Sequence, residues 1–236
     1  MFSFLNKFGL VLTRSQNVDP QQRMDVVVQR ELLVIDLFVD VGANSGQTYS
    51  RVRKLGFSKS YLAIEPELSC FKALQSLQNE DTDLHCINSA IGDRQARVVL
   101  NVANNSALSS SLLTFSESHL AAAPWIKMNS TQEVKMETLS NLLSQSSARR
   151  IFLKIDVQGY ELEVLRGICD EDWLRIEVIL IECNLINSYT DASLIEDVLA
   201  LLRKRNFNPF RIENGFGMPN FGQQLQVDIL FKRIPT

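Results

Sequence analysis

Phe38-Val39-Asp40-Val41-Gly42-Ala43-Asn44-Ser45-Gly46-Gln47 is the stretch that decides the fold of this chain. The apolar run at 35–41 predicts a buried strand, which continues into a glycine-rich turn and a helix to about residue 55. In open α/β sheets, ligands bind at such a turn, because glycine lets the backbone approach them closely. The stretch therefore predicts an α/β sheet with a ligand site at the end of its first strand.

The same alternation of strand and helix continues through the chain. Further strands are predicted at 61–65, 84–88, 151–156, 178–182, 209–212 and 227–231. Helical patterns lie between them at 66–78, 138–145, 160–166 and 194–205. This order predicts a Rossmann-like fold with a mostly parallel seven-stranded sheet, an antiparallel C-terminal strand and helices on both faces.

The domain organisation follows from length and from the breaks in this pattern. A chain of 236 residues suits one α/β domain, which we place at 31–236, after an N-terminal helical extension at 1–30. An insertion is expected at about 95–136, where 97–102 and 133–136 resemble a strand pair. The serine-rich stretch 104–111 between them is interpreted as a mobile loop that is either functional or a solvated linker.

Composition excludes several classes of function. A net charge of -3 and a pI near 5.5 give no electrostatic reason to expect a nucleic-acid partner. The four cysteines form no C-x-x-C pair, which argues against structural zinc and favours a reducing compartment, so we expect a cytoplasmic protein. The sequence is compatible with a homodimer and does not decide the oligomeric state.

The N-terminal stretch 1–12 is apolar but interrupted by Lys7. It is far below the roughly 20 residues that span a bilayer, so stable membrane insertion is not expected. We interpret it as an amphipathic helix packed on the domain, with a membrane-surface anchor as the alternative.

The turn itself indicates what it binds. Asp40-x-Gly42-x-x-x-Gly46 differs from the G-x-G-x-x-G of dinucleotide sites, because an acidic residue leads it. Such a turn suits a cationic group, an α-amine or a sulfonium, better than phosphates. Glu65 ends the second strand, where a carboxylate can accept both hydroxyls of a ribose. We expect Asp40, Gly42, Asn44, Gly46 and Glu65 to bind the cofactor.

A third element follows the third strand, at Ser89-Ala90-Ile91-Gly92-Asp93. Ala90 and Ile91 are expected to flank an adenine, with Ile91 packed on it. The alternative is an ordinary turn that closes the strand.

These motifs, together with one in the fourth strand, resemble the FkbM family of methyltransferases. The resemblance covers roughly 34–231 and rests on 38–47, Ile64-Glu65-Pro66, 89–93 and Leu153-Lys154-Ile155-Asp156-Val157-Gln158-Gly159-Tyr160-Glu161. It implies a class I methyltransferase domain, S-adenosyl-L-methionine as methyl donor and, most often, O-methylation of a hydroxyl on a sugar or small natural product. The chain has Gln158 where the family frequently has glutamate.

A hydroxyl acceptor usually needs a base or a metal to help remove its proton. Asp156, at the tip of the fourth strand, is the first candidate base and also a candidate cofactor ligand. Glu182, at the tip of the fifth strand, is the second, and the two carboxylates could together hold Mg²⁺. The alternative for both is hydrogen bonding that fixes the loops.

Two further side chains are catalytic candidates. Lys154 shares the face of Asp156, so we expect a structural ion pair with Asp156 or Glu182, with activation of the acceptor oxygen as the alternative. His119 lies in the insertion and is expected at the surface. Its alternative role is a general base carried over the cleft by a mobile segment.

Three other functions stay open at this point. A non-catalytic binding module would keep the nucleoside pocket without turnover, in line with Gln158 and the lack of an obvious base. A nucleotide-dependent oxidoreductase is disfavoured by the glycine spacing. N-methylation on the same fold would be favoured by an Asn-Pro-Pro-Tyr-type motif, but Asp156-Val157-Gln158-Gly159 stands at that position.

Overall fold

The computed structural model of the chain describes residues 20–218 and 222–234. The predicted N-terminal helix at 1–12 lies outside these residues. No helix within the described ranges is long and apolar enough to cross a membrane.

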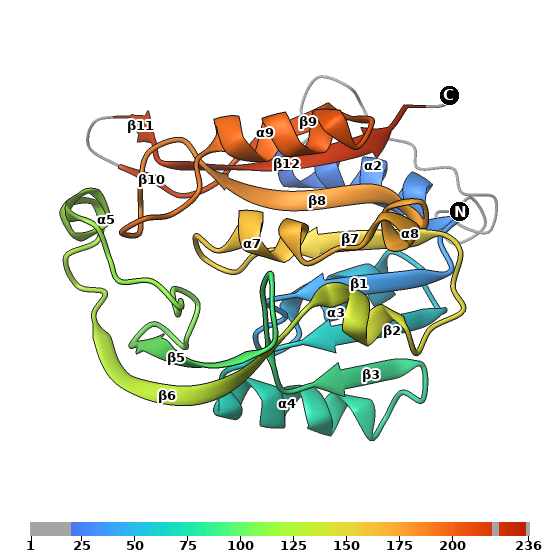
Figure 1. Cartoon of the computed structure of the whole chain (residues 1–236), viewed down its shortest axis with the longest axis horizontal. Helices are drawn as coiled ribbons and strands as arrows, with labels where there is room; N and C mark the ends of the chain where they lie inside the picture. The colour runs from blue at the N-terminus through green and yellow to red at the C-terminus, as the bar shows by residue number, and fades with distance from the viewer. Residues whose placement is uncertain (1–19, 219–221, 235–236) are drawn as a thin grey trace.

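Seven strands form the main sheet, and eight helices are described around it and in the connecting segments (Figure 1). The strands of the main sheet are β1 (Leu37–Val41), β2 (Ser60–Ile64), β3 (Leu84–Ile87), β7 (Ile151–Ile155), β8 (Ile176–Asn184), β9 (Phe207–Asn214) and β12 (Gln226–Arg233). The helices are α2 (Pro20–Leu32), α3 (Gln47–Lys54), α4 (Leu68–Gln78), α5 (Glu117–Ala122), α6 (Leu139–Leu143), α7 (Glu161–Arg166), α8 (Asp170–Trp173) and α9 (Ile195–Lys204).

The order of the main sheet is β3-β2-β1-β7-β8-β12-β9. Neighbouring strands are parallel except at β12, which runs antiparallel to both β8 and β9. The order reverses between β1 and β7, which is where ligands bind in open α/β sheets. The predicted fold class is thus confirmed.

Both faces of the sheet are covered, so its central strands are apolar almost throughout. Alternate residues of β1 point to opposite faces. Leu37, Val39 and Val41 pack with residues of α6, α7, α8 and α9, whereas Phe38 packs with residues of α2, α3 and α4. The alternation of residues along β1 therefore determines which helices cover each face of the sheet next to the edge where ligands bind.

The face toward α2 and α3 contains an aromatic stack across three strands. The ring of Phe38 lies 4.9 Å from that of Tyr61 and 4.7 Å from that of Phe152, both nearly parallel to it. All three are cross-strand partners in the register of β2, β1 and β7. Such pairs stabilise a sheet beyond their buried area, so the stack holds the three strands that carry the cofactor motifs in register.

The segment between β3 and α6 forms a sheet of its own, in the order β4-β6-β5. Its strands are β4 (Ala90–Ile91), β5 (Ala96–Ala103) and β6 (Met128–Glu137), and β5 pairs with β6 in antiparallel fashion over almost its whole length. In Figure 1 this sheet stands beyond the carboxyl ends of β1, β2 and β3, and α5 stands farther out on the same side, near β10. A smaller pair, β10 (Gly217–Met218) and β11 (Gln223–Gln224), precedes β12.

Candidate active site

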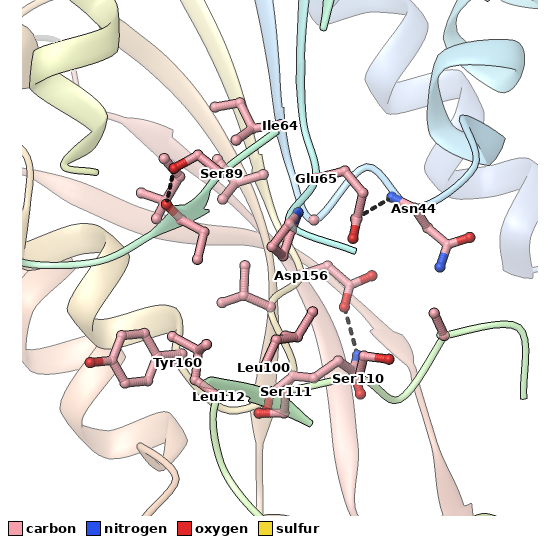
Figure 2. A pocket seen from close by; sticks show the side chains of 18 of the residues that line it. Asn44, Ile64, Glu65, Ser89, Leu100, Ser110, Ser111, Leu112, Asp156 and Tyr160 are labelled. Carbon is pink, nitrogen blue, oxygen red and sulfur yellow. Dashed lines mark hydrogen bonds between the residues drawn. The ribbon is translucent and has the colours of Figure 1, made fainter. Parts of the chain in front are cut away.

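A first cavity lies at the carboxyl edge of the main sheet, between the glycine turn and the serine-rich stretch (Figure 2). Its walls come from the ends of β1, β2 and β7, from β4, and from 107–112. Six of the expected cofactor residues line it: Gly42, Asn44, Glu65, Ala90, Ile91 and Asp156. The topology therefore brings together residues from four separate motifs.

The two glycines of the turn are required by packing. Gly42 has φ +79°, and a Cβ there would lie 1.8 Å from the carbonyl oxygen of Asp156. Gly46 has φ +93°, and a Cβ there would lie 2.7 Å from Leu77 Cδ1. Gly42 thus allows the first turn to touch the backbone of the fourth-strand motif, and Gly46 lets it rest on α4.

Glu65 is buried in the cavity wall with its carboxylate held in place. Its Oε2 accepts the Asn44 N–H at 2.8 Å and its Oε1 accepts the Glu67 N–H at 2.8 Å. Figure 2 shows the first of these bonds at the edge of the pocket. Burial raises the pKa of Glu65 to about 7, although both backbone donors oppose the shift. Each oxygen keeps a further lone pair, so the carboxylate can still accept a diol.

The remainder of the cavity is largely apolar. Ile64 and Ile91 form one part of its wall, and Leu100 and Leu112 form another. In Figure 2, Leu100, Ser110, Ser111 and Leu112 lie across the pocket from Ile64 and Glu65. The Glu65 carboxylate beside an apolar slot suits a ribose joined to an adenine, so the residues present fit an adenosyl group.

Asp40 differs from our expectation that it contacts the ligand. It is fully buried beneath the turn, where its Oδ2 accepts the Tyr61 hydroxyl at 2.7 Å and its Oδ1 lies 3.0 Å from Lys154 Nζ. Lys154 also donates to the Gly42 carbonyl at 2.8 Å and lies 3.5 Å from Asp156 Oδ2. Burial alone would lower the pKa of Lys154, but Asp40 and Asp156 hold it above its ordinary value. Lys154 is thus in an ion pair as expected, with Asp40 as the closer partner.

Asp156 and Glu182 are brought together by a residue that stands between them. The Gln158 amide nitrogen donates to Asp156 Oδ1 at 2.7 Å and to Glu182 Oε2 at 2.9 Å. Burial, with the nearby charge of Asp156, raises the pKa of Glu182 well above its ordinary value. The pair expected to hold Mg²⁺ is therefore bridged by a neutral donor. Among the described residues, no group of three or more His, Cys, Asp or Glu side chains could hold a metal ion, so the arrangement does not fit Mg²⁺.

A second cavity of about 420 Å³ adjoins the first and shares Asp156 with it. It lies on the α2 and α3 side of β7, β8, β12 and β9, and its lining is mostly polar: Met24, Thr48, Arg51, Lys154, Ile155, Asp156, Leu180, Glu182, Glu213, Asn214 and Asp228. Asp228 is the register partner of both Glu182 and Glu213. Like charges directly opposite one another destabilise a sheet, so this acidic row has a cost. Burial raises the pKa of Asp228 to about 6.

His119 differs from the expected surface residue. It is 3% exposed, stacked on Phe115 at a centroid distance of 4.0 Å, and flanked by Tyr189 at 5.5 Å and Phe216 at 5.4 Å. Neither ring nitrogen has a hydrogen-bond partner among the described residues. Burial lowers its pKa, as expected for an imidazole in an apolar site. The structure places His119 in an aromatic cluster, and it is not among the residues that line the two cavities.

Other site residues could not be identified from sequence patterns alone. Glu161 is 1% exposed, and its carboxylate accepts the N–H groups of Val157 and Gly159, which closes the turn that carries Gln158. Tyr189 donates its hydroxyl to the Gln158 carboxamide oxygen at 2.6 Å. The sequence feature that pointed to this part of the site was Gln158, which stands where the otherwise matching family motif frequently has glutamate.

The comparison with known proteins agrees with this geometry. A family model described as the methyltransferase FkbM domain matches residues 40–209, from the glycine turn to β9. The chain belongs to the FkbM methyltransferase family. It is therefore a methyltransferase domain, and the family implies S-adenosylmethionine as its methyl donor.

Two relatives illustrate the likeness. The FkbM chain is 27% identical over 163 residues to "Methyltransferase 1" of Beauveria bassiana (strain ARSEF 2860), covering 61% of this chain and 63% of that protein. The crystal structure of methyltransferase FkbM from Methylobacillus flagellatus KT has a TM-score of 0.50 and 14% identity, over 83% of this chain and 43% of that one. The chain thus spans less than two thirds of either relative, and the second likeness concerns the fold alone.

Proposed function

We propose that this FkbM domain transfers the methyl group of S-adenosylmethionine to a hydroxyl of a small polar acceptor, such as a sugar or a natural product. The observation that carries the proposal is that Asp156 lines both cavities. A base at this junction can reach the molecule to be methylated in one cavity while the cofactor fills the other. Holding two reactants in this way supplies much of the rate of a displacement reaction.

The first cavity is assigned to the cofactor. Glu65 would accept the ribose hydroxyls, Ile91 and Leu100 would contact the adenine, and Gly42 and Asn44 would present backbone atoms. When bound, S-adenosylmethionine supplies an electrophilic methyl group on a sulfonium.

The second cavity is assigned to the acceptor. Its lining offers carboxylates, an amide and the hydroxyl of Thr48, all of which can hydrogen-bond to hydroxyl groups. Its few apolar side chains, such as Met24 and Leu180, give little surface for a large hydrophobic acceptor. The lining therefore favours a hydroxylated, hydrophilic molecule.

Asp156 is proposed to take the proton of the acceptor hydroxyl. Its side chain is 38% exposed and lies beside the charge of Lys154, so it can reach a ligand in the cavity. Glu182 is buried, and its raised pKa favours the protonated form, which leaves Asp156 as the base of the pair. Two carboxylates in different environments can thus take different roles.

Calorimetry and product analysis test the proposal. We expect micromolar binding of S-adenosylmethionine and of S-adenosylhomocysteine, weakened about tenfold by Glu65→Ala, which corresponds to about 1.4 kcal/mol. With a panel of sugars and hydroxylated metabolites, we expect release of S-adenosylhomocysteine, and Asp156→Asn should lower kcat by at least about 100-fold. Absence of cofactor binding by the wild-type domain would overturn the proposal.

Two alternatives give different results in the same assay. A non-catalytic module would bind S-adenosylmethionine without releasing S-adenosylhomocysteine on any acceptor. N-methylation is a second candidate, because the acidic row formed by Glu182, Asp228 and Glu213 would also attract a protonated amine. The position of the new methyl group, determined by NMR of the product, separates oxygen from nitrogen as the acceptor atom.

A further inference from the structure

Gln158 adopts a backbone conformation that its side chain disfavours. Its φ is +59°, in the left-handed region that residues with a Cβ rarely occupy. Its carbonyl oxygen accepts the Ser111 hydroxyl at 2.7 Å. Such strain persists only where the surrounding structure determines it, and it is common at functional sites.

The carboxamide of Gln158 can have only one orientation. Its nitrogen faces two carboxylate groups, Asp156 and Glu182, and its oxygen accepts the Tyr189 hydroxyl. Carboxylates accept hydrogen bonds, so the amide nitrogen must point toward them and the oxygen toward the tyrosine. Each of the two amide hydrogens therefore holds one of the two carboxyl groups.

A neutral donor is what this location requires. The ionisable groups that surround the carboxamide are Lys154 of β7, Asp156 directly after it, Glu182 of β8, Asp228 of β12, Glu161 of α7 and Tyr189 of the β8–α9 loop. Most of them are acids, and the charge of Asp156 already helps to raise the pKa of Glu182, so the donor between the two groups must bring no further negative charge. Gln158 supplies that donor without adding a charge.

The same residue is tied to the wall of the cofactor cavity. Ser111, which holds the Gln158 carbonyl, also pairs with Asn101 of β5 through two backbone hydrogen bonds. Tyr189, which orients the carboxamide, also lies within hydrogen-bonding distance of the Ser109 carbonyl at 3.3 Å. The serine-rich stretch 104–111 and the carboxylate pair therefore meet at Gln158.

We propose that Gln158 is a positioning residue that couples docking of the serine-rich stretch over the cofactor cavity to assembly of the Asp156–Glu182 pair. When 104–111 is docked, Ser111 and Tyr189 fix the backbone and the carboxamide, and both carboxyl groups are held. When the stretch leaves, the amide is free to turn and the pair separates. The catalytic meaning of the pair rests on the proposed function, whereas the coupling itself does not.

Hydrogen exchange of the Ser111 amide tests the coupling without an acceptor. In Gln158→Glu, a third carboxylate replaces the donor when it is ionised, but a protonated carboxyl can still donate. We expect Ser111 to exchange about tenfold faster than in the wild type at pH 8, the usual effect of losing hydrogen bonds to charged groups, and at nearly the wild-type rate at pH 5. Gln145→Glu, the same change at an exposed site, should leave the ratio at one. An equal ratio at both pH values would overturn the coupling.

A second variant guards against misfolding of the first. Glu182→Gln replaces the second carboxyl group of the pair with a carboxamide, at the oxygen atom where Glu182 Oε2 accepts the amides of Gln158 and Gln226. Because the amide bridge is weakened, we expect Ser111 to exchange about threefold faster, within the range for one hydrogen bond. An unchanged rate contradicts the coupling.

The two proposals fail in different ways. If the wild-type domain releases no S-adenosylhomocysteine but both variants change the exchange of Ser111, the methyl-transfer proposal fails and the coupling stands. If the wild type is active but the exchange ratios stay at one, the coupling fails alone. In an active enzyme, kcat of Gln158→Glu should also fall on the alkaline side, at a pH where the wild type is still active, because the introduced carboxyl group ceases to donate once it is ionised.

Discussion

Lys154 Nζ lies 3.0 Å from Asp40 Oδ1, beneath the turn that forms the floor of the cofactor cavity. The same ammonium group donates to the Gly42 carbonyl at 2.8 Å. Asp40 and Lys154 are register partners on adjacent parallel strands, so the pair joins β1 to β7 at the reversal of strand order. The position of the glycine turn therefore depends on a buried charge pair.

Lys154→Met should destabilise the domain strongly. It leaves Asp40, which is 0% exposed, without its counter-charge, and breaking a buried pair in this way costs about 3–5 kcal/mol. Urea denaturation measures the loss. In the double variant with Asp40→Asn the loss should be clearly smaller than the sum of the two single losses; strict additivity would contradict the pairing.

Gly42→Ala should lower both stability and cofactor affinity. The added Cβ would lie 1.8 Å from the Asp156 carbonyl oxygen, so the turn and the fourth-strand motif must separate. Gly56→Ala is the matched control, because Gly56 also has positive φ, +97°, but its Cβ would meet nothing within 4 Å. We expect about 1 kcal/mol of loss for the control and at least twice that for Gly42→Ala, measured by thermal denaturation.

Affinity for S-adenosylhomocysteine should rise with pH through about 7. Burial raises the pKa of Glu65 to about 7, and the ionised form is the better acceptor for two ribose hydroxyls. Below that pH, binding must first remove a proton, so affinity should fall by up to about tenfold per pH unit. Calorimetry at pH 5.5, 7 and 8.5 checks this. Glu65→Gln should bind more weakly with little pH dependence, and parallel curves for the two proteins would contradict the role of Glu65.

Glu161 should make the domain less stable as pH rises. Burial raises its pKa from 4.5 to about 7, so the native state binds this proton more tightly than the unfolded state. The resulting stabilisation is complete below about 4.5 and is lost as pH increases through about 7, with a magnitude of about 3 kcal/mol. Urea midpoints at pH 5 and pH 8 should therefore differ more in the wild type than in Glu161→Gln.

His119 should have the opposite dependence. Burial lowers its pKa below the unfolded value of 6.5, so acid must charge an imidazole that has no partner among the described groups around it. Its favourable contribution is present above pH 6.5 and is lost as pH falls through the lowered native pKa. His119→Phe keeps the aromatic contacts and should shift the acid-unfolding midpoint, followed by circular dichroism, to lower pH. An unchanged midpoint would show that His119 does not limit acid stability.

The fold could be predicted from sequence because its signals are local. Most strands are short apolar runs followed by a helical pattern. The glycine turn identifies the first strand of the sheet, at whose end the ligand site was predicted. Glu65 and Ile91 were expected in the cofactor cavity because Glu65 directly follows β2 and Ile91 comes a few residues after β3, and parallel strands end at one edge. The positions of both residues could therefore be predicted from the order of strands and helices along the chain.

The contacts that could not be predicted join residues far apart in the chain. Asp40 and Lys154 meet only because β1 and β7 are neighbours in a particular register. His119 is buried because rings from the β8–α9 loop and from Phe216 surround it, and no local pattern indicates those contacts. Gln158 looked like a lost carboxylate, whereas its amide satisfies two carboxylates from different strands.

The place of β12 in the sheet has a consequence for synthesis. Of the described strands β12 is the last in the chain, yet it lies between β8 and β9 rather than at an edge. Until it emerges from the ribosome, β8 and β9 both lack a neighbour, and the apolar side chains of β8 stand beside an open gap. Unpaired strands of this kind are prone to aggregate. The domain thus completes its main sheet only after β12 has been synthesised, and we expect truncation before Gln226 to yield an insoluble chain rather than a smaller methyltransferase.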